Sequence, residues 1–148
     1  MTRSIVPILC VVLVLGLATG CARIRPPRGV QPVVREMEVT GYCSCRSCTN
    51  WRRNWLLRPV IAGGPQAGQR KRVGITASGT RARPGTLAAD TSRYPFGTVM
   101  HIPGYGYGRV EDRGSAIQGD RLDLYFRSHR EALQWGRQTV PVRIWPSR

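Results

Sequence analysis

Polar and apolar residues alternate along residues 33–42, VVREMEVTGY, with the period of a strand. On such a strand Met37 and Val39 share one face, while Thr40 and Tyr42 lie on the other. Shorter strand-like runs bounded by glycine or proline follow at residues 73–78, 86–89, 98–102, 109–112, 122–126 and 140–145.

One helix is predicted from signals at both of its ends. Ser128 and Glu131 have the spacing of a capping box, and Gly136 ends the helical stretch. Residues 43–72 look irregular, with a further short helix expected over residues 49–57. Many short strands, glycine turns and one short helix predict an all-β, barrel-like domain.

The N-terminal residues are typical of an exported chain. A basic start, an apolar run over residues 5–17 and the small residues 18–20 indicate a signal peptide over residues 1–20. Ala18-Thr19-Gly20-Cys21 resembles a lipobox, so we expect lipidation at Cys21, with plain secretion or a retained anchor as alternatives. Residues 21–33 are rich in arginine and proline and predict an extended tether, which leaves residues 34–148 as the domain.

The charge of the chain is strongly positive. It has 148 residues, with 23 Lys+Arg against 8 Asp+Glu and a formal net charge of +15. Such a charge often indicates a nucleic-acid partner, but export argues against one. We therefore expect anionic envelope polymers to be attracted by the densest basic stretch, which lies within residues 46–72 and overlaps a predicted insertion over residues 49–72. A solvated loop is the alternative.

Three cysteines cluster immediately after the first strand, as Cys43, Cys45 and Cys48. In an exported domain this odd count favours one disulfide plus a spare thiol. Three free thiols or a partial zinc site are the alternatives, but neither His101 nor His129 has ligand spacing to the cluster. We therefore assign no metal site and expect no cofactor.

The few carboxylates narrow the search for chemistry. Asp90 and Asp112 each end a predicted apolar strand. Asp123 lies within Leu122-Asp123-Leu124-Tyr125-Phe126, where it shares a strand face with Tyr125. Aspartate is a poor strand former, so three such residues indicate more than turn capping.

An ordered series of motifs resembles the 3D domain family, named for three aspartates. The motifs are ITASGT (75–80), LAAD (87–90), PFGT (95–98), IPGYG (102–106), VEDRG (110–114), AIQG (116–119) and LDLYF (122–126). The resemblance implies a six-stranded double-psi β-barrel. It also implies kinship with the catalytic barrel of MltA-type lytic transglycosylases and with stationary-phase survival proteins that cleave or remodel peptidoglycan.

By this resemblance Asp123 matches the catalytic acid, and Asp112 and Asp90 match the other two aspartates. Further residues are expected to contact substrate: Thr76, Ser78, Gly114, Tyr125 and Tyr42. Two departures stand out. Ser115 replaces the second glycine of the usual Gly-Gly pair, and no second domain is expected within these residues to complete the groove.

The expected function is therefore cleavage of O-glycosyl bonds in peptidoglycan glycan strands by an enzyme of the cell envelope, anchored through lipid to the outer membrane or the periplasmic face. A lytic transglycosylase needs one acid, because the 6-hydroxyl of N-acetylmuramate attacks C1 and leaves a 1,6-anhydro end. Ordinary hydrolysis needs two carboxylates. The alternative is a barrel that binds the envelope without cleaving it.

Overall fold

The computed structural model describes residues 24–147 of the chain. The predicted signal peptide and Cys21 therefore lie outside the described residues. Among the described residues, no helix combines the length and the apolar character needed to cross a membrane.

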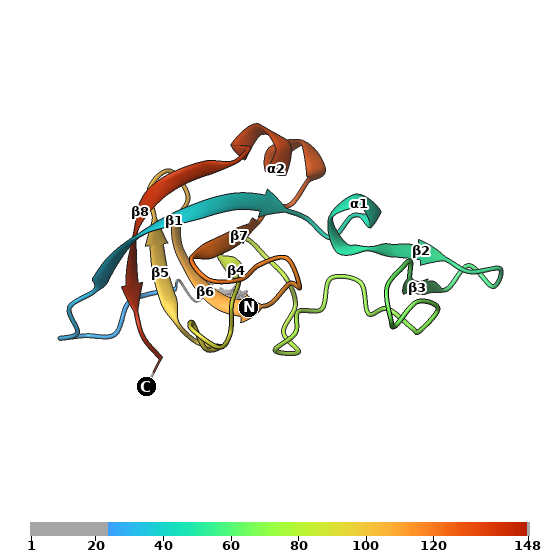
Figure 1. The fold of residues 1–148 in the computed structure, drawn as a ribbon, viewed down its shortest axis with the longest axis horizontal. Coiled ribbons are helices and arrows are strands. Elements are labelled where there is room, and N and C mark those ends of the chain that lie inside the picture. Colours follow the sequence, from blue (N-terminus) through green and yellow to red (C-terminus); the bar gives the residue numbers. More distant parts are fainter. Residues whose placement is uncertain (1–23, 148) are drawn as a thin grey trace, which may run out of the picture.

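Six strands close into a barrel in the order β1-β7-β4-β6-β5-β8. Their bounds are β1 Val33–Tyr42, β4 Thr86–Ala89, β5 Val99–Ile102, β6 Gly106–Asp112, β7 Arg121–Tyr125 and β8 Gln138–Trp145. Figure 1 shows them wrapped around a common interior. The all-β class and the six-stranded barrel are thus confirmed, while the double-psi connection remains a prediction.

Strand β1 joins two neighbours of different direction. It runs parallel to β7, where Thr40 pairs with Asp123, and antiparallel to β8, where Met37 pairs with Val140. The predicted alternation holds, because Met37 is fully buried in the core while Thr40 faces away from it. This register brings the polar face of β1 beside the polar face of β7.

The core fills the barrel with apolar side chains from every strand. Its fully buried members include Met37, Val39, Leu87, Met100, Ile102, Val110, Leu122, Leu124 and Val142. Gly108 on β6 lets the Leu87 side chain of the neighbouring strand β4 pack against the backbone, since a Cβ there would lie 2.5 Å from Leu87 Cδ2. The interior is therefore closely packed with apolar side chains, and a ligand site is expected at an end of the barrel.

The predicted capping box is confirmed at helix α2, His129–Trp135. The Ser128 hydroxyl accepts a hydrogen bond from the Glu131 backbone N–H over 3.2 Å, and Gly136 follows the helix with a positive φ of 69°. Helix α2 packs beside β1 at the edge of the barrel (Figure 1).

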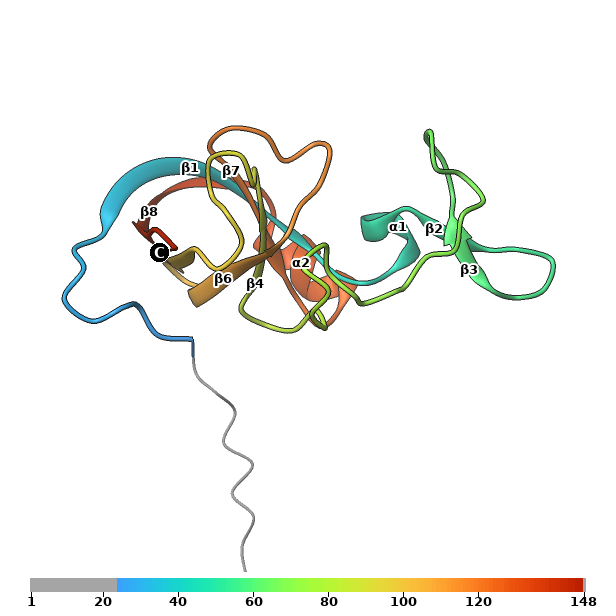
Figure 2. The same cartoon turned by 90° about the horizontal axis from the view of Figure 1, so that it is seen from below.

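An arginine-rich arm, residues 46–72, projects away from the barrel in both views (Figures 1 and 2). It contains the single-turn helix α1, Arg46–Thr49, and a hairpin of β2, Trp51–Arg53, with β3, Pro59–Ile61. The arm begins three residues before the expected insertion at residue 49.

The helix expected over residues 49–57 is wrong. Asn50 adopts a left-handed conformation that ends α1, and Trp51 then pairs with Ile61 across the hairpin. At the hairpin tip the Asn54 side chain accepts hydrogen bonds from the backbone N–H groups of Leu56 and Arg58. These local bonds compete with a helical backbone.

The strand expected over residues 73–78 is also absent from the part of the chain that the structure describes. Only one isolated bridge forms there, between Ile75 and Arg81. The backbone N–H groups of Thr76 and Gly79 donate to carbonyls within the same loop, those of Thr80 and Thr76. These groups are therefore unavailable for a longer strand ladder.

The described part of the predicted tether, residues 24–32, contains no helix or strand. It lies along the barrel, where the Trp145 indole N–H donates to the Val30 carbonyl over 3.0 Å. The last third of the segment before β1 is therefore fastened to β8.

Candidate functional site

A cavity of about 490 Å³ opens at the end of the barrel nearest the arm. Of the residues predicted from sequence, Tyr42, Thr76, Asp112, Gly114 and Asp123 line it. The arm and the segment that returns from it supply Cys48, Thr49, Asn50, Gln66, Lys71 and Gly74. The cavity is thus a groove between the barrel end and the base of the arm.

Asp123 enters this groove from the middle of β7, on the face opposite its buried neighbours Leu122 and Leu124. The Thr40 hydroxyl donates to Asp123 Oδ1 over 3.0 Å. Burial raises the pKa of Asp123 to about 6; the Thr40 hydrogen bond opposes this rise, and the charge of Asp112 adds to it. Asp123 can therefore exist in both protonation states near neutral pH.

Asp112 lies beside it at the C-terminal end of β6. Three donors converge on its carboxylate: the Tyr42 hydroxyl at 3.1 Å, the Ala77 N–H at 3.0 Å and the Arg113 N–H at 2.9 Å. This arrangement stabilises a carboxylate that accepts hydrogen bonds. The two groove aspartates thus have different surroundings, one with a raised pKa and one held by three donors.

The hydroxyls predicted to contact substrate form a small network in the loop before β4. Thr76 Oγ1 lies 3.1 Å from Ser78 Oγ and 2.9 Å from Thr80 Oγ1. Thr76 lines the groove, whereas Ser78 is exposed outside the lining and its backbone N–H donates to the Glu111 carbonyl.

Tyr125 lies next to the groove rather than in its wall. Its hydroxyl is 3.2 Å from Ser44 Oγ, and its ring meets that of Tyr42 edge to face with centroids 5.4 Å apart. The structure therefore places Tyr125 as a support for Tyr42 and for the chain that leaves β1.

Asp90 lies outside the groove that contains the other two aspartates. It lines a neighbouring hollow together with Gly114. Its carboxylate accepts hydrogen bonds from the Ser92 hydroxyl at 2.6 Å and the Gly119 N–H at 2.8 Å, and these bonds lower its pKa. In this position Asp90 ties the turn after β4 to the loop before β7.

Two contributors to the groove were not predicted from sequence. Thr40 was assigned only to a strand face, although the pairing of β1 with β7 makes it the hydrogen-bond donor to Asp123. The Ala77 N–H has no sequence signal, because backbone groups are the same in every residue. The sequence signal that could have identified Thr40 was its position on the same strand face as Tyr42.

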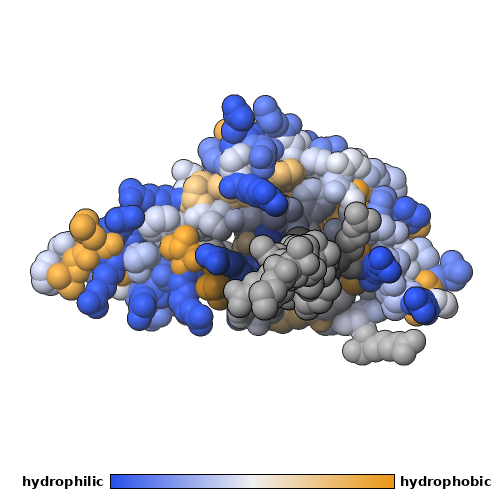
Figure 3. All heavy atoms as spheres, turned by 180° about the vertical axis from the view of Figure 1, so that it is seen from behind, coloured by the Kyte–Doolittle hydropathy of each residue, from blue (hydrophilic) through white to orange (hydrophobic). Residues whose placement is uncertain are grey.

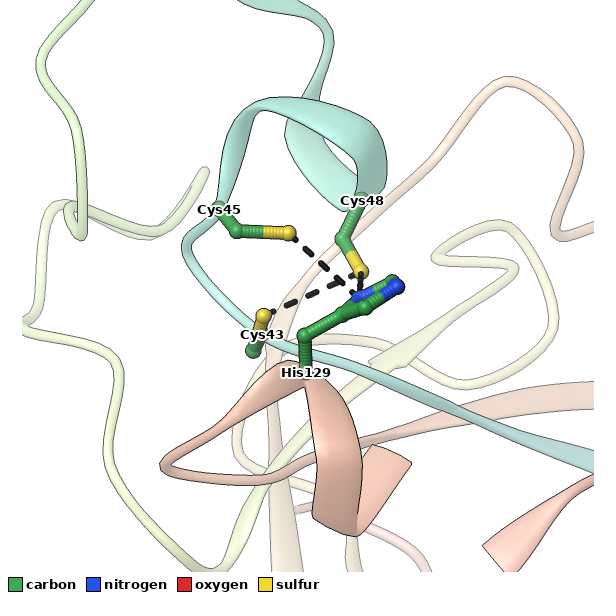
Figure 4. A group of neighbouring side chains, drawn as sticks. All are labelled: Cys43, Cys45, Cys48 and His129. Carbon is green, nitrogen blue, oxygen red and sulfur yellow. Dashed lines mark hydrogen bonds between the residues drawn. The ribbon is translucent and has the colours of Figure 1, made fainter. Parts of the chain in front are cut away.

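The three cysteines are free thiols in the structure, with Cys43 buried and the other two partly buried. Figure 4 shows them gathered around His129, which is the first residue of α2. His129 was set aside as a ligand because its spacing in the sequence does not match the cluster, but the fold brings it beside Cys45 and Cys48. The four residues bring one ligand atom each within 4.8 Å of one another, a cluster that the sequence analysis did not predict.

The surface of the arm combines basic and apolar side chains. Arg52, Arg53 and Arg58 are exposed on the hairpin, beside Trp55, Leu56 and Leu57, whose exposed fractions are 87%, 47% and 68%. Figure 3 shows hydrophilic and hydrophobic atoms mixed over this part of the molecule. Within residues 24–147, the ion pairs of arginine involve the barrel rather than the arm.

Comparison with known proteins supports the resemblance found in the motifs. Residues 85–146 match the family model of the 3D domain. The chain is 40% identical over 58 residues to YabE of Bacillus subtilis, named as a cell wall shaping protein, and 32% identical over 75 residues to the cell wall-binding protein YocH of the same organism. These alignments cover 39% and 48% of this chain. They cover only 14% and 26% of the relatives' own lengths.

Two solved structures of the lytic transglycosylase MltA from E. coli are similar to part of the chain. One is an apo form of a variant, at 21% identity and a TM-score of 0.40, covering 49% of this chain and 27% of that one. The other is at 19% identity and a TM-score of 0.40, covering 53% and 30%.

Proposed function

From the premise that residues 85–146 form a 3D domain, we propose that the protein cleaves peptidoglycan glycan strands as a lytic transglycosylase. The observation that carries the proposal is the pair of groove aspartates. Asp123 has a pKa raised to about 6, and Asp112 beside it accepts three hydrogen bonds. Asp123 can therefore hold a proton near neutral pH, while Asp112 accepts hydrogen bonds from three donors.

Asp123 would act first as an acid and then as a base. In its protonated form it gives its proton to the glycosidic oxygen that follows N-acetylmuramate, and the C1–O bond breaks. The resulting carboxylate then takes the proton of the sugar's 6-hydroxyl as that oxygen bonds to C1. Asp123 thus regains the proton that it gave, and the product has a 1,6-anhydro end that forms without attack by water.

The neighbouring groups hold this carboxyl in place. Thr40 fixes one oxygen of Asp123 through its hydroxyl, which leaves the other oxygen for the substrate. The negative charge of Asp112 raises the pKa of Asp123 and can favour positive charge that develops at C1. Asp90 is a positioning residue in this proposal, because it holds the loop that carries Gly119 rather than the groove itself.

The groove has the size of a ligand site. A volume of about 490 Å³ falls within the ordinary range for small-ligand pockets. The base of the arm forms one wall, with Asn50, Gln66 and Lys71 as polar side chains. These groups can bind the hydroxyls, amides and carboxylates of a glycan strand with its peptides.

The relatives support a cell-wall substrate. YabE and YocH are named for shaping and binding the cell wall. Asp112 and Asp123 lie within residues 85–146, which match the family model of the 3D domain. The matched region is a small share of either relative, so the support concerns the domain and not their whole activities.

Mass spectrometry of muropeptides tests the proposal. Purified full chain is incubated with peptidoglycan sacculi, and the soluble products are analysed. Anhydro ends, one water lighter than hydrolysed ends, are expected. Reducing ends would indicate hydrolysis with a second carboxylate, and an absence of soluble products over a range of pH and salt would remove the catalytic proposal.

A second candidate function is envelope binding without cleavage. The exposed arginines of the arm and the name of YocH favour it. Binding without products, measured by co-sedimentation with sacculi, would support this function. The binding should weaken with added salt, because the arm's attraction to anionic polymers is electrostatic.

We also propose that the chain is exported and anchored through lipid at Cys21 in the cell envelope. The support is the sequence of residues 5–21, with its apolar run followed by Ala-Thr-Gly-Cys. Globomycin, which blocks the lipoprotein signal peptidase, should cause the precursor to accumulate. Unchanged processing under globomycin would contradict the lipid anchor.

A further inference from the structure

Four potential metal ligands from three separate elements converge at the root of the arm (Figure 4). Cys43 follows β1, Cys45 and Cys48 belong to the turn that forms α1, and His129 begins α2. Cys48 and His129 are 81 residues apart in the chain. Nothing in the proposed glycan chemistry uses this cluster.

All four ligand atoms lie within 4.8 Å of one another, and three of their mutual distances match those of a tetrahedral site. Cys43 Sγ and Cys48 Sγ are 3.8 Å apart, and His129 Nδ1 lies 3.5 Å from Cys45 Sγ and 3.4 Å from Cys48 Sγ. Zinc bonds sulfur at about 2.3 Å and nitrogen at about 2.0 Å, so a tetrahedron places two sulfurs about 3.8 Å apart and a sulfur and a nitrogen about 3.5 Å apart.

We propose that Cys43, Cys45, Cys48 and His129 bind one Zn²⁺ ion in a Cys₃His site. Three thiolates and an imidazole are the ligand set that zinc takes in structural sites, and soft sulfur ligands disfavour magnesium and calcium. On binding, the three thiols release their protons to solvent, and the Nδ1 lone pair of neutral His129 occupies the fourth position. No oxidation or reduction is involved.

The site is structural because its four protein ligands leave no open position for water or substrate. Its place in the fold gives it a specific task. The ion joins the end of β1 and the start of α2 to the turn from which the arm leaves the barrel. Cys48 also lines the groove beside Asn50, so the ion fixes the wall that the arm contributes.

A disulfide is the competing arrangement for the same cysteines. It would need two sulfurs at about 2.0 Å and would leave the third thiol and His129 without a common role. The separation of 3.8 Å between the Cys43 and Cys48 sulfurs is that of two ligands on one ion rather than of a covalent bond. The zinc site accounts for all four side chains at once.

Metal content of the purified full chain tests the site. The chain is expressed with zinc in the medium, purified in detergent without chelators, and measured by atomic emission. One zinc per chain is expected, and the thiols of Cys43, Cys45 and Cys48 should react with an alkylating agent only after a chelator is added. Cobalt(II) in place of zinc should give the thiolate charge-transfer and ligand-field absorption of a tetrahedral site, and this readout needs no variant.

Matched variants identify the ligands. His129→Gln and Cys45→Ser should each lower zinc retention against a competing chelator by at least tenfold. His101→Gln removes the other histidine, on β5 away from the cluster, and should retain the ion.

Three results would overturn the site. They are a disulfide between two of Cys43, Cys45 and Cys48, seen as an intact mass two hydrogens lower than the reduced chain, free reaction of all three of these thiols in a chain saturated with zinc, or full zinc retention by His129→Gln. None of these results bears on glycan cleavage, which is measured separately on sacculi.

Discussion

Thr40 and Asp123 are paired residues on the parallel strands β1 and β7, and the Thr40 hydroxyl donates to Asp123 Oδ1 over 3.0 Å. The contact joins residues 83 positions apart in the chain. It holds one oxygen of a carboxyl whose pKa is raised by burial, so we expect the proton of Asp123 on the other oxygen, Oδ2.

The first prediction concerns this carboxyl as the proton donor. Asp123→Asn should lower anhydro-muropeptide release about 10²–10⁴-fold, because general acid–base catalysis contributes about that much. Mass spectrometry of the products is the measurement. Glu36→Gln, an exposed amide substitution on β1, is the matched control and should leave release unchanged. Undiminished cleavage by Asp123→Asn would remove Asp123 from the role.

The pH dependence of cleavage follows from the same group. Only the protonated carboxyl can donate, and the pKa of Asp123 is about 6. The rate should therefore fall about tenfold for each pH unit above about 7. Initial rates of release from sacculi between pH 5 and pH 9 check this. A rate that rises through that range would show that the ionised carboxylate is the reactive form.

The stability of the protein should depend on pH through Asp123 as well. Its pKa in the fold, about 6, exceeds the ordinary value of 3.8, so the folded state holds the proton more tightly than the unfolded chain. Stability from this group is complete below about pH 4 and is lost as the pH rises through about 6.

Asp123→Asn removes that loss, because a neutral amide does not titrate. At pH 8 the free energy of unfolding of the variant should exceed that of the wild type by about 1–3 kcal/mol. At pH 4 the ionisation of Asp123 should contribute no such difference. Urea unfolding at the two pH values measures the difference. A gap between variant and wild type that is the same at both values would contradict the raised pKa.

Tyr42 is predicted to act through Asp112. Burial, with the Asp112 charge next, raises the pKa of Tyr42 far above its ordinary range, so its hydroxyl remains a donor. Tyr42→Phe should lower the free energy of unfolding by about 0.5–1.5 kcal/mol and reduce cleavage, since Asp112 loses one of its three donors. Tyr107→Phe, at a partly exposed ring on β6, is the control for both assays.

The packing of the barrel gives a prediction that does not depend on function. Gly108→Ala would place a Cβ 2.5 Å from Leu87 Cδ2 and 2.6 Å from its Cγ, which overpacks the core. The expected loss is about 1–3 kcal/mol of unfolding free energy. Gly63→Ala adds the same methyl group in the arm, where the nearest atom is Asn50 Oδ1 at 4.0 Å, and thermal unfolding should distinguish the two.

Much of the barrel was predictable because its strands carry local signals. The alternation of residues 33–42 and the apolar runs at 86–89 and 122–126 correspond to β1, β4 and β7 with bounds that differ by no more than one residue. The capping box identified α2 for the same reason, since a cap is made by neighbours in sequence. The face on which Asp123 lies followed from the strand period alone.

The hairpin of the arm and the position of Asp90 were not predictable in this way. The expected helix over residues 49–57 gave way to a hairpin, because pairing of Trp51 with Ile61 and the side-chain bonds of Asn54 outweigh local helix propensity. Asp90 carried the same strand-end pattern as Asp112, yet the chain turns it into a different hollow. An aspartate at the end of a strand has the same sequence pattern whichever way the following turn directs its side chain.

By itself the sequence determined the period of the strands, the cap of the helix, the resemblance to the 3D domain and the small set of carboxylates that could carry chemistry. The tertiary structure decided which of these groups meet. Thr40 reaches Asp123 across 83 residues, and His129 reaches Cys48 across 81. Periodicity and capping act between near neighbours, whereas these contacts depend on strand order and barrel closure, and therefore on the packing of the whole core.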